Sequence, residues 1–346
     1  MKVTLKDIAE ETGYSISTIS RVLSNAGKIS TRASKKIVEA ANRLNYPLSK
    51  IQGYEQNNLP HNVAVIADFH EGEFYASYFY GFLKAARSEN IRLSLLNVSN
   101  PRKDARAFLK EIIEEGYYDS VILFMPELEH HDYENIVEVI PDTFPVVSNA
   151  LIENPLLSTI TFDGYSAGYQ AADHFYNQGY KNLGIVKGPS FKPESRFRYN
   201  GFNDFINTKP EMNLVWESEG DFEFDSGVRS FKNLMESNMQ VDAVFVSNDL
   251  MATAFLAMSQ IYNVKIPDDL AILGYDDLPM CQQTIPVISS IKTDFERLGT
   301  ATIQTLKTRF SPTHHQHGIL SMIPVKLIPR SSSIRKSESV EQVPLH

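Results

Sequence analysis

Four residues near the N-terminus, Ile16, Ser17, Ser20 and Arg21, have the types and spacing to contact nucleic acid. They share one face of a short helical pattern that opens near Ser15. The opposite face is apolar and consists of Ile19, Val22 and Leu23. A short helix with this pattern is the kind of element that enters the DNA major groove, provided that other helices hold its apolar face.

Another short helix comes directly before it. Its inward positions repeat at helical spacing, and they are Leu5, Ile8, Ala9 and Thr12. Thr4 and Asp7 form a start of the capping-box type, and Gly13 allows the sharp bend because glycine tolerates positive φ. Two short helices joined by such a turn predict a helix-turn-helix, although topology alone leaves an ordinary αα-hairpin open.

Charge is distributed unevenly along the chain. The net charge of the 346 residues is −9. Residues 1–50 hold nine Lys/Arg and four acids, which gives +5, so the remainder carries 24 bases and 38 acids, or −14. A basic head on an acidic body is expected if only the head meets phosphates, and a solvated basic face is the alternative.

A third helix and a linker complete the head. Ser30 is expected to cap this helix, whose apolar face consists of Ala33, Ile37, Ala40, Ala41 and Leu44. Pro47 ends it. Residues 47–62 are polar, contain Gly and Pro, and are interpreted as a linker. We therefore expect a small all-α head over residues 1–46.

From residue 63 onward, short apolar strands alternate with helices. This pattern predicts parallel sheets of the α/β class. A segment of some 270 residues is larger than a single hydrophobic core usually supports, so we expect two lobes. A cleft between two such lobes is the natural small-molecule site. The predicted strands are 63–69, 92–98, 120–125, 145–148, 159–162, 183–187, 214–217, 243–247, 271–273 and 288–292.

Composition excludes several other classes of protein. A single cysteine, Cys281, forbids an intrachain disulfide framework and fits a reducing cytoplasm. No apolar run approaches the length of a membrane helix, and the charged N-terminus is no signal peptide. His314, His315 and His317 are interpreted as a surface loop, not a metal site. We predict neither metal nor cofactor, a disordered tail over 331–346, and no enzyme, since phosphate-loop, nucleophile-elbow and zinc motifs are missing.

In this order of segments, the chain resembles the lactose/galactose-repressor (LacI/GalR) family of bacterial transcription regulators. The resemblance covers about residues 2–330. In the head it rests on Val3-Thr-Leu-Lys-Asp-Ile-Ala9, Gly13, Ser15-Ile-Ser-Thr-Ile-Ser-Arg-Val-Leu23 and Leu44-Asn-Tyr46. In the body it rests on Asp163, Gly168, Ala172-Asp-His-Phe175, Gly179-Tyr180, Gly188-Pro189, Arg196-Phe-Arg198, Gly201-Phe202, Gly220-Asp-Phe222, Ser226-Gly227, Ser247-Asn-Asp249, Gly274-Tyr-Asp-Asp277, Leu298-Gly299 and Pro329-Arg330.

The resemblance implies that a homodimer binds double-stranded operator DNA, with one recognition helix of each protomer in the major groove. Arg21 would pair with guanine O6 and N7, while Ile16 and Ser17 would take the variable base-reading positions; simple helix packing is the alternative for Ile16. The remaining expected DNA contacts, chiefly to phosphates, are Leu5, Ser15, Thr18, Ser20, Lys28, Ser30 and Tyr46.

For the body, the resemblance implies a periplasmic-binding-protein-like effector domain over 63–330. Lobe 1 is expected at about 63–160 and 292–323, and lobe 2 at about 161–290 and 324–330. Arg198 would bind the effector, Asn248 and Asp276 would bind sugar hydroxyls, and Phe222 would stack on the sugar. Lobe 1 would add Phe74, Tyr75 and Phe124. Lobe packing is the alternative for Phe74 and Tyr75, and turn capping is the alternative for Asp276 and Asp277.

Two departures from the family pattern stand out. Relatives form a hinge helix in the linker, with a small residue followed by a leucine that wedges into the DNA minor groove. An ungapped count from Tyr46 places Gln52 and Glu55 at these two positions. A glutamate cannot act as an apolar wedge. In lobe 1, Phe124 stands where sugar-binding relatives often carry a polar residue, and Asn149 and Ala150 stand where an acid is common.

The function implied is a dimeric, effector-controlled transcription repressor of carbohydrate genes that acts in the cytoplasm. A sugar is expected as inducer. The alternatives are a nucleobase corepressor, a solute-binding protein for transport, or a sugar-acting enzyme. The missing signal peptide and the basic head argue against a transport protein, and the missing catalytic motifs argue against an enzyme.

Overall fold

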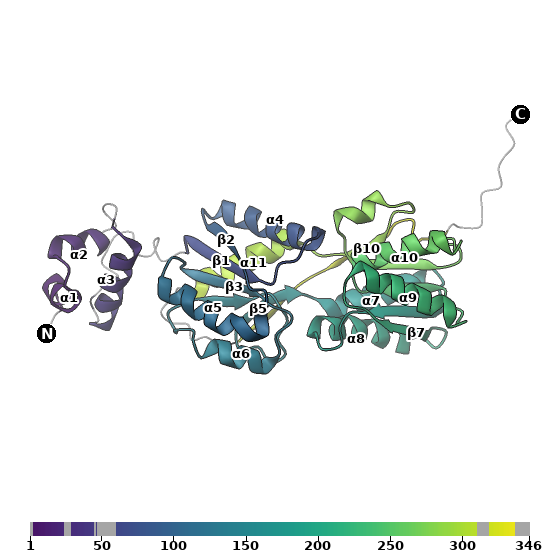
Figure 1. Ribbon diagram of the computed structural model, residues 1–346, viewed down its shortest axis with the longest axis horizontal. Coiled ribbons are helices and arrows are strands. Elements are labelled where there is room, and N and C mark those ends of the chain that lie inside the picture. The colour runs from purple at the N-terminus through teal and green to yellow at the C-terminus, as the bar shows by residue number, and fades with distance from the viewer. Residues whose placement is uncertain (1–2, 24–28, 45, 47–59, 310–317, 336–346) are drawn as a thin grey trace, which may run out of the picture.

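The computed structural model describes residues 3–23, 29–44, 46, 60–309 and 318–335. Three helices, α1 (Leu5–Thr12), α2 (Ile16–Leu23) and α3 (Thr31–Arg43), form the head. Figure 1 shows these helices beside a larger body of two α/β lobes, each built around its own sheet. Hinge positions 52 and 55, Lys28 and the three histidines 314, 315 and 317 lie outside the described residues.

The head follows its local sequence signals closely. The backbone N–H and the hydroxyl of Thr4 both donate to the Asp7 carboxylate, at 2.7 and 2.8 Å, so the predicted capping box is confirmed. Gly13 adopts φ +76°, which confirms the reason for a glycine between the helices. A small buried core joins the three helices and consists of Ile8, Ile19, Leu23, Ile37, Ala40 and Ala41.

Lobe 1 is built on a parallel six-stranded sheet with the order β11-β5-β4-β3-β1-β2. Its strands are β1 (Asn62–Ala67), β2 (Arg92–Asn97), β3 (Ser120–Phe124), β4 (Val146–Ser148), β5 (Ser158–Phe162) and β11 (Leu320–Ile323). Two separate cores show that helices cover both faces. These helices are α4 (Glu73–Ser88), α5 (Pro101–Glu115), α6 (His130–Val137) and α11 (Phe295–Arg309).

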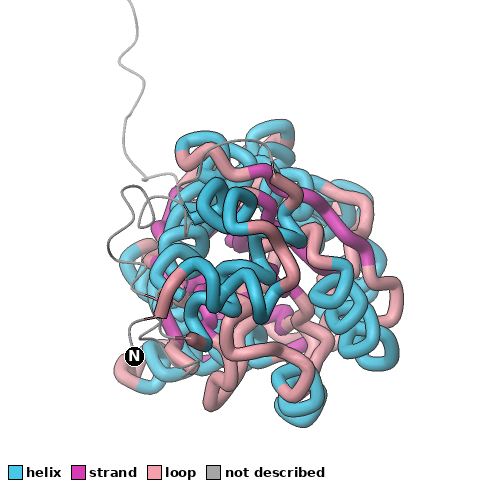
Figure 2. Tube along the Cα trace, turned by 90° about the vertical axis from the view of Figure 1, so that its left-hand side faces the viewer, coloured by secondary structure: helices cyan, strands magenta, loops and turns pink. Residues whose placement is uncertain are grey.

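Lobe 2 has a sheet of the same size with the order β12-β10-β9-β8-β6-β7, parallel except for β12. Its strands are β6 (Asn182–Lys187), β7 (Asn213–Glu219), β8 (Ala243–Val246), β9 (Ala271–Asp276), β10 (Ser289–Lys292) and β12 (Lys326–Ile328). Its helices are α7 (Gly164–Asn177), α8 (Pro193–Asn207), α9 (Phe224–Glu236), α10 (Asp249–Ile261) and the 3₁₀ helix η2 (Pro279–Gln283). Seen along the long axis, helices lie on either side of the strands (Figure 2).

The chain passes between the lobes three times, after β5, after β10 and between β11 and β12. Most strands lie where the alternating pattern predicts them, but β11 and β12 were not predicted. The predicted disordered tail is wrong for its start, because Ser332 and Ser333 are fully buried. The Ser333 hydroxyl lies 2.7 Å from Nε2 of His174 on α7, so this segment packs on lobe 2. Residues 336–346 lie outside the described part of the chain.

Candidate functional site

The outward face of α2 is the candidate surface for DNA. Ile16 is 49% exposed, whereas Ile19 is completely buried, so the packing alternative for Ile16 is wrong. Ser17 and Arg21 are exposed beside it, and Ser20 is exposed as well. The helix thus presents one apolar and several polar groups at the surface, which is what contact with base edges requires.

Hydroxyl groups organise the start of α2. The Ser15 hydroxyl accepts a hydrogen bond from the Thr18 backbone N–H at 3.1 Å and also lies within 2.9 Å of the Ser17 and Thr18 hydroxyls. Since a helix N-terminus carries unsatisfied N–H groups and a partial positive charge, this end can also face a phosphate. Ser15 is therefore both a helix cap and a candidate phosphate contact.

The other predicted DNA contacts divide into two groups. Ser30 caps α3, because its hydroxyl accepts from the Ala33 N–H at 3.4 Å, and it stays exposed. Leu5 and Tyr46 are half-buried against the head core, so packing accounts for much of their surface.

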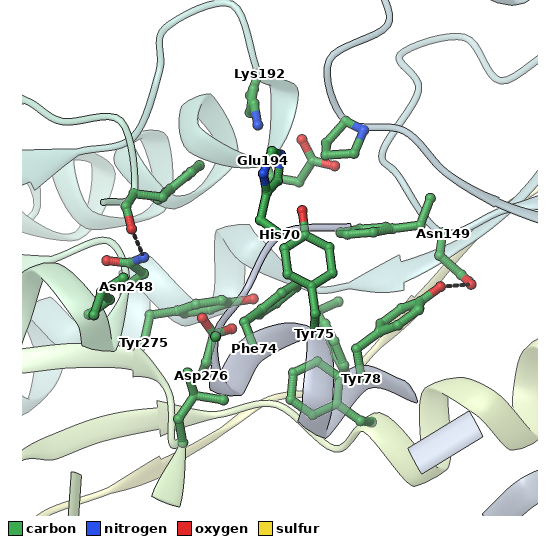
Figure 3. Close-up of a pocket in the computed structure, with 18 of the residues that line it drawn as sticks. His70, Phe74, Tyr75, Tyr78, Asn149, Lys192, Glu194, Asn248, Tyr275 and Asp276 are labelled. Atoms are coloured by element: carbon green, nitrogen blue, oxygen red, sulfur yellow. Dashed lines mark hydrogen bonds between the residues drawn. The ribbon is translucent and has the colours of Figure 1, made fainter. Parts of the chain in front are cut away.

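A cavity of about 320 Å³ lies between the two lobes of the body. All seven residues predicted from the family pattern to bind the effector line it, and they are Phe74, Tyr75, Phe124, Arg198, Phe222, Asn248 and Asp276. Figure 3 shows Phe74 and Tyr75 of lobe 1 beside Tyr275 and Asp276 of lobe 2, whereas the Tyr78 hydroxyl points to Asn149. Residues more than 200 positions apart in the chain therefore share one site.

The wall from lobe 1 is aromatic. The Phe74 ring meets the rings of Tyr75 and Phe124 at centroid distances of 5.3 and 5.8 Å, and Phe124 stacks on Tyr78 at 4.9 Å. Burial raises the pKa of Tyr75 well above its usual value, so its hydroxyl stays protonated and can donate. Packing and cavity lining are not alternatives for these residues, because the rings do both.

Arg198 occupies the middle of the lobe 2 wall. Its guanidinium carbon lies 3.8 Å from the centroid of the Tyr275 ring and 5.5 Å from that of Phe222. One terminal nitrogen donates to the Ser247 carbonyl at 2.6 Å, while its buried Nε atom has no partner among the described residues. The rings and the carbonyl thus hold a planar donor group in a fixed orientation at the cavity.

Asn248 serves the fold more than the sequence pattern suggests. Its Oδ1 accepts from the Met251 N–H at 3.0 Å, which caps α10, and its amide donates to the Phe222 carbonyl at 2.7 Å. Phe222 itself has φ +74°, an uncommon conformation for a residue with a side chain. Asn248 therefore fixes the backbone that carries the Phe222 ring, and only part of its amide remains for a ligand.

Asp276 and Asp277 have different roles. Asp277 pairs with Arg330 at 2.5 Å, and its backbone N–H donates to the Ser290 hydroxyl. The Asp276 side chain lines the cavity, and burial raises its pKa well above the usual range although Arg198 opposes this shift. The Asp277 carboxylate is thus held by Arg330 and accepts from no backbone N–H of the turn among the described residues, whereas the Asp276 side chain belongs to the cavity.

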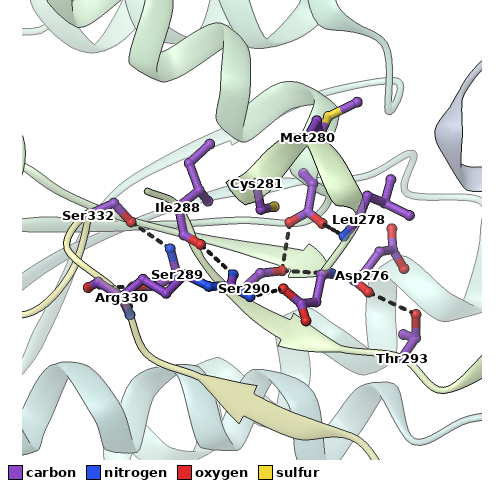
Figure 4. A network of polar contacts seen from close by, with 12 residues as sticks. Asp276, Leu278, Met280, Cys281, Ile288, Ser289, Ser290, Thr293, Arg330 and Ser332 are labelled. Carbon is purple, nitrogen blue, oxygen red and sulfur yellow. Dashed lines mark hydrogen bonds and ion pairs between the residues drawn. The ribbon is translucent and has the colours of Figure 1, made fainter. Parts of the chain in front are cut away.

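A buried polar network supports this wall from behind (Figure 4). The Asp249 carboxylate accepts from the Ser290 hydroxyl at 2.6 Å and from the Leu278 N–H at 2.8 Å. Its burial raises the pKa of Asp249 to about 7. Asn149 plays a similar part in lobe 1, because it accepts from the Tyr78 hydroxyl at 2.9 Å and donates to the Ile160 carbonyl at 2.7 Å.

Seven charged residues that line the site were not predicted from the sequence, and those that form contacts between the lobes include Glu127, Lys192 and Glu194. Glu194 Oε1 accepts from the backbone N–H of Leu151 in lobe 1 at 2.7 Å. Lys192 pairs with Glu127 of lobe 1 at 2.9 Å. Glu194 stands four residues before Arg198 on α8, and this i,i+4 spacing on one helical face could have identified it. Within the described residues, no group of three or more His, Cys, Asp or Glu side chains is arranged to hold a metal ion.

Comparison with known proteins agrees with this arrangement. Residues 4–47 match the family model described as bacterial regulatory proteins, lacI family, and residues 172–333 match a periplasmic binding protein-like domain. The HTH-type transcriptional repressor PurR of Photobacterium profundum is 26% identical over 329 residues, which are 95% of this chain and 98% of that protein. The ribose operon repressor of Halalkalibacterium halodurans is 23% identical over 303 residues, which cover 88% and 89%.

Solved structures share the fold. A complex of the transcriptional regulator CelR with cellobiose superposes with a TM-score of 0.69 at 22% identity, over 96% of this chain and all of the other. The lac repressor dimer bound to operator and the anti-inducer ONPF gives 0.70 at 20% identity, over 97% of this chain and all of the other. No described helix has the length and apolar character needed to cross a membrane.

Proposed function

The chain belongs to the lacI family of bacterial regulatory proteins, and from that premise we propose that it is a dimeric transcription repressor of carbohydrate genes controlled by a sugar-type effector between its lobes. DNA binding by the head is the function of the family. Such a regulator works in the bacterial cytoplasm, where its operator is. The dimer, the sugar and the genes are part of the proposal.

The observation that carries the proposal is the convergence of seven predicted effector residues, contributed by both lobes, on one cavity. The cavity combines aromatic faces with a few oriented polar groups, and a sugar needs both, since its apolar face stacks while its hydroxyls form hydrogen bonds. Closure of the lobes around the effector would alter the dimer geometry and so the affinity for the operator.

Contacts across the cleft support this mechanism. Within the described residues, four polar contacts join the lobes: the two at Glu194 and Lys192, an ion pair of Arg196 with Glu153 at 2.7 Å, and a bond from the Met280 N–H to Glu73 at 2.8 Å. These contacts break when the lobes separate. An effector that bridges the lobes therefore shifts the equilibrium between open and closed states by its preference for the closed one.

A nucleobase corepressor is the second candidate. The flat aromatic wall of Phe74, Tyr75 and Phe124 can stack on a purine as well as on a sugar. The similarity to repressors named PurR points in the same direction.

The test has two steps. Selection of bound sequences from random duplex DNA should yield a near-palindromic operator, since the two-fold axis of a dimer is mirrored in its site. Thermal-shift screening of sugars against nucleobases should then show stabilisation by a sugar, because a ligand of the native state raises its stability by mass action. Stabilisation by nucleobases alone would favour a nucleobase corepressor over a sugar effector. Failure to select any DNA sequence would contradict the proposal that the protein is a transcription regulator.

A further inference from the structure

The cavity between the lobes is strongly acidic. Among the described side chains that line it, Lys192 and Arg198 are permanently cationic, and His70 is the one histidine. The carboxylates that line it are Glu71, Glu73, Glu127, Glu194, Asp221, Glu223 and Asp276. A cleft lined by one sign of charge concentrates ligands of the opposite sign and disfavours ligands of its own sign.

One of the two cations is paired with an acid, and the other is held by uncharged groups. Lys192 is paired with Glu127, with 15% of its side chain exposed. Arg198 lies against Tyr275 and donates to the Ser247 carbonyl. Of the acids, Asp221 is paired with Arg229 at 3.0 Å and Glu73 accepts from the Met280 N–H. Among the described residues, no ion pair is formed by Glu71, Glu194, Glu223 or Asp276.

Several oxygen atoms of these carboxylates also lack a hydrogen-bond donor among the described residues. Asp276 is 6% exposed, and no described donor reaches its carboxylate. The second oxygens of Glu127 and Glu194 are buried and have no partner among the described residues. A buried carboxylate oxygen without a hydrogen-bond donor destabilises the protein. A ligand that supplies a donor to this oxygen removes that cost, which makes its binding free energy more favourable.

Aromatic faces complete the surroundings. Phe74, Tyr75, Phe222 and Tyr275 line the cavity with these acids. The face of an aromatic ring carries partial negative charge and attracts a desolvated cation, while it also accepts the apolar face of a sugar ring. The Lys192 ammonium, 5.7 Å from the Phe222 ring centroid, shows that a primary amine fits in such surroundings.

We propose that the effector carries a positive charge: it is an amine-bearing, polyhydroxylated small molecule of the amino-sugar class, and Glu194 is the residue that selects its ammonium group. Asp276 and Arg198 then bind hydroxyls. The inference rests on the proposed function, because it takes this cavity to be the effector site. Phosphorylated sugars are disfavoured by the same carboxylates.

Proton linkage adds an independent signature. Burial raises the pKa of both Glu194 and Asp276, so these groups hold protons more readily than free carboxyls. An ammonium group favours their charged forms and therefore releases protons when it binds. The affinity for an amine should thus increase as the pH rises through the range in which the carboxyls lose their protons.

The experiment compares matched ligands on the full chain by calorimetry and thermal shift. The probes are D-glucosamine, D-glucose, N-acetyl-D-glucosamine and glucose 6-phosphate, with the corresponding galactose and mannose series. We expect one amine to bind at least about tenfold more tightly than its neutral and acetylated counterparts, since hydrogen bonds to charged groups are the stronger ones, and to release protons. We expect no binding of the phosphates.

The matched variant is Glu194→Gln, which keeps the shape and an oxygen that accepts from the Leu151 N–H. It should weaken amine binding about tenfold or more and leave the Tm of the free protein nearly unchanged, whereas Glu236→Gln, on the exposed end of α9, should change neither. Equal or tighter binding of neutral sugars, absence of binding by every amine, or an unchanged affinity in Glu194→Gln overturns the inference. If a neutral sugar binds and alters the operator affinity, the inference that the effector is positively charged is wrong, while the proposed function still holds.

Discussion

Arg198 lies flat against Tyr275, with its guanidinium carbon 3.8 Å from the centroid of the ring. Arg198 comes from α8 and Tyr275 from β9, so the contact joins a helix to a fully buried strand of lobe 2. The arginine is held by a ring and a carbonyl, and its remaining N–H groups can be directed at a ligand.

Replacing Arg198 should abolish the effector response. Arg198→Ala removes an oriented charged donor, a change worth about 1.5–3 kcal/mol, or roughly tenfold to more than a hundredfold in affinity. Operator binding without effector should remain, because the head is unchanged. Arg198→Lys keeps the charge but loses the planar group and is expected to be nearly as defective. Wild-type stabilisation by the effector in Arg198→Ala, measured by thermal shift, contradicts the assignment.

Arg21 should determine sequence preference, not overall attraction to DNA. Arg21→Ala removes the side chain that can bond twice to guanine and should cost about 1–3 kcal/mol of discrimination at one base pair of each half-site. Arg21→Lys retains the charge, so it should preserve salt-dependent binding while losing most of that discrimination. Gel shifts with point-substituted operators measure the effect, and a wild-type base preference in Arg21→Ala would refute it.

Gly168 permits the close contact between α7 and α8 that positions Arg198. A Cβ atom at Gly168 would lie 1.9 Å from the Arg198 carbonyl oxygen and 2.6 Å from the Phe202 nitrogen, and both are backbone atoms that cannot turn aside. Gly168→Ala should therefore push the helices apart, destabilise lobe 2 by about 1–3 kcal/mol and weaken effector binding. Asn200→Ala, at an exposed position of α8, is the control. The free energy of unfolding of both variants is measured by denaturant unfolding. Equal values for Gly168→Ala and Asn200→Ala would contradict the prediction, because α8 could then move away without loss of stability.

Asp249 should make the stability of the body depend on pH. Burial raises its pKa from 3.8 to about 7, so the native state binds a proton that the unfolded chain releases. The stability from this proton is fully present below about pH 4 and is lost as the pH rises toward 7. Because the side chain in Asp249→Asn is always neutral, Tm should fall less between pH 5 and 8 in this variant than in the wild-type protein. A decline as steep as that of the wild type would show that other groups cause the pH dependence.

Local sequence signals predicted the head well, because its structure depends on short-range chemistry. The Thr4–Asp7 capping box and the positive φ of Gly13 are properties of a few neighbouring residues. The alternation of strands and helices in the body is equally local, since a buried parallel strand needs a continuous apolar run. These features could therefore be inferred without any knowledge of tertiary contacts.

Features that depend on distant contacts could not be inferred in this way. Ser332 and Ser333 look like part of a polar tail, yet Ser332 bonds to the carbonyl of Ile272 and the N–H of Ser289, which satisfies its hydroxyl in the core. Glu194 resembles an ordinary surface acid of a helix until Leu151 of the other lobe is seen to donate to it. The capping role of Asn248 likewise depends on where Phe222 lies.

The coupling between the cleft and the head is tested most directly by measuring the Kd for a selected operator, by fluorescence anisotropy, without ligand and with a saturating concentration of a small molecule that stabilises the protein. We predict that a sugar-type ligand weakens operator binding about 5-fold to 150-fold, the usual range of such coupling, and that it does not do so in Arg198→Ala. An unchanged Kd for the operator in the wild-type protein, with the cleft saturated, would contradict the account.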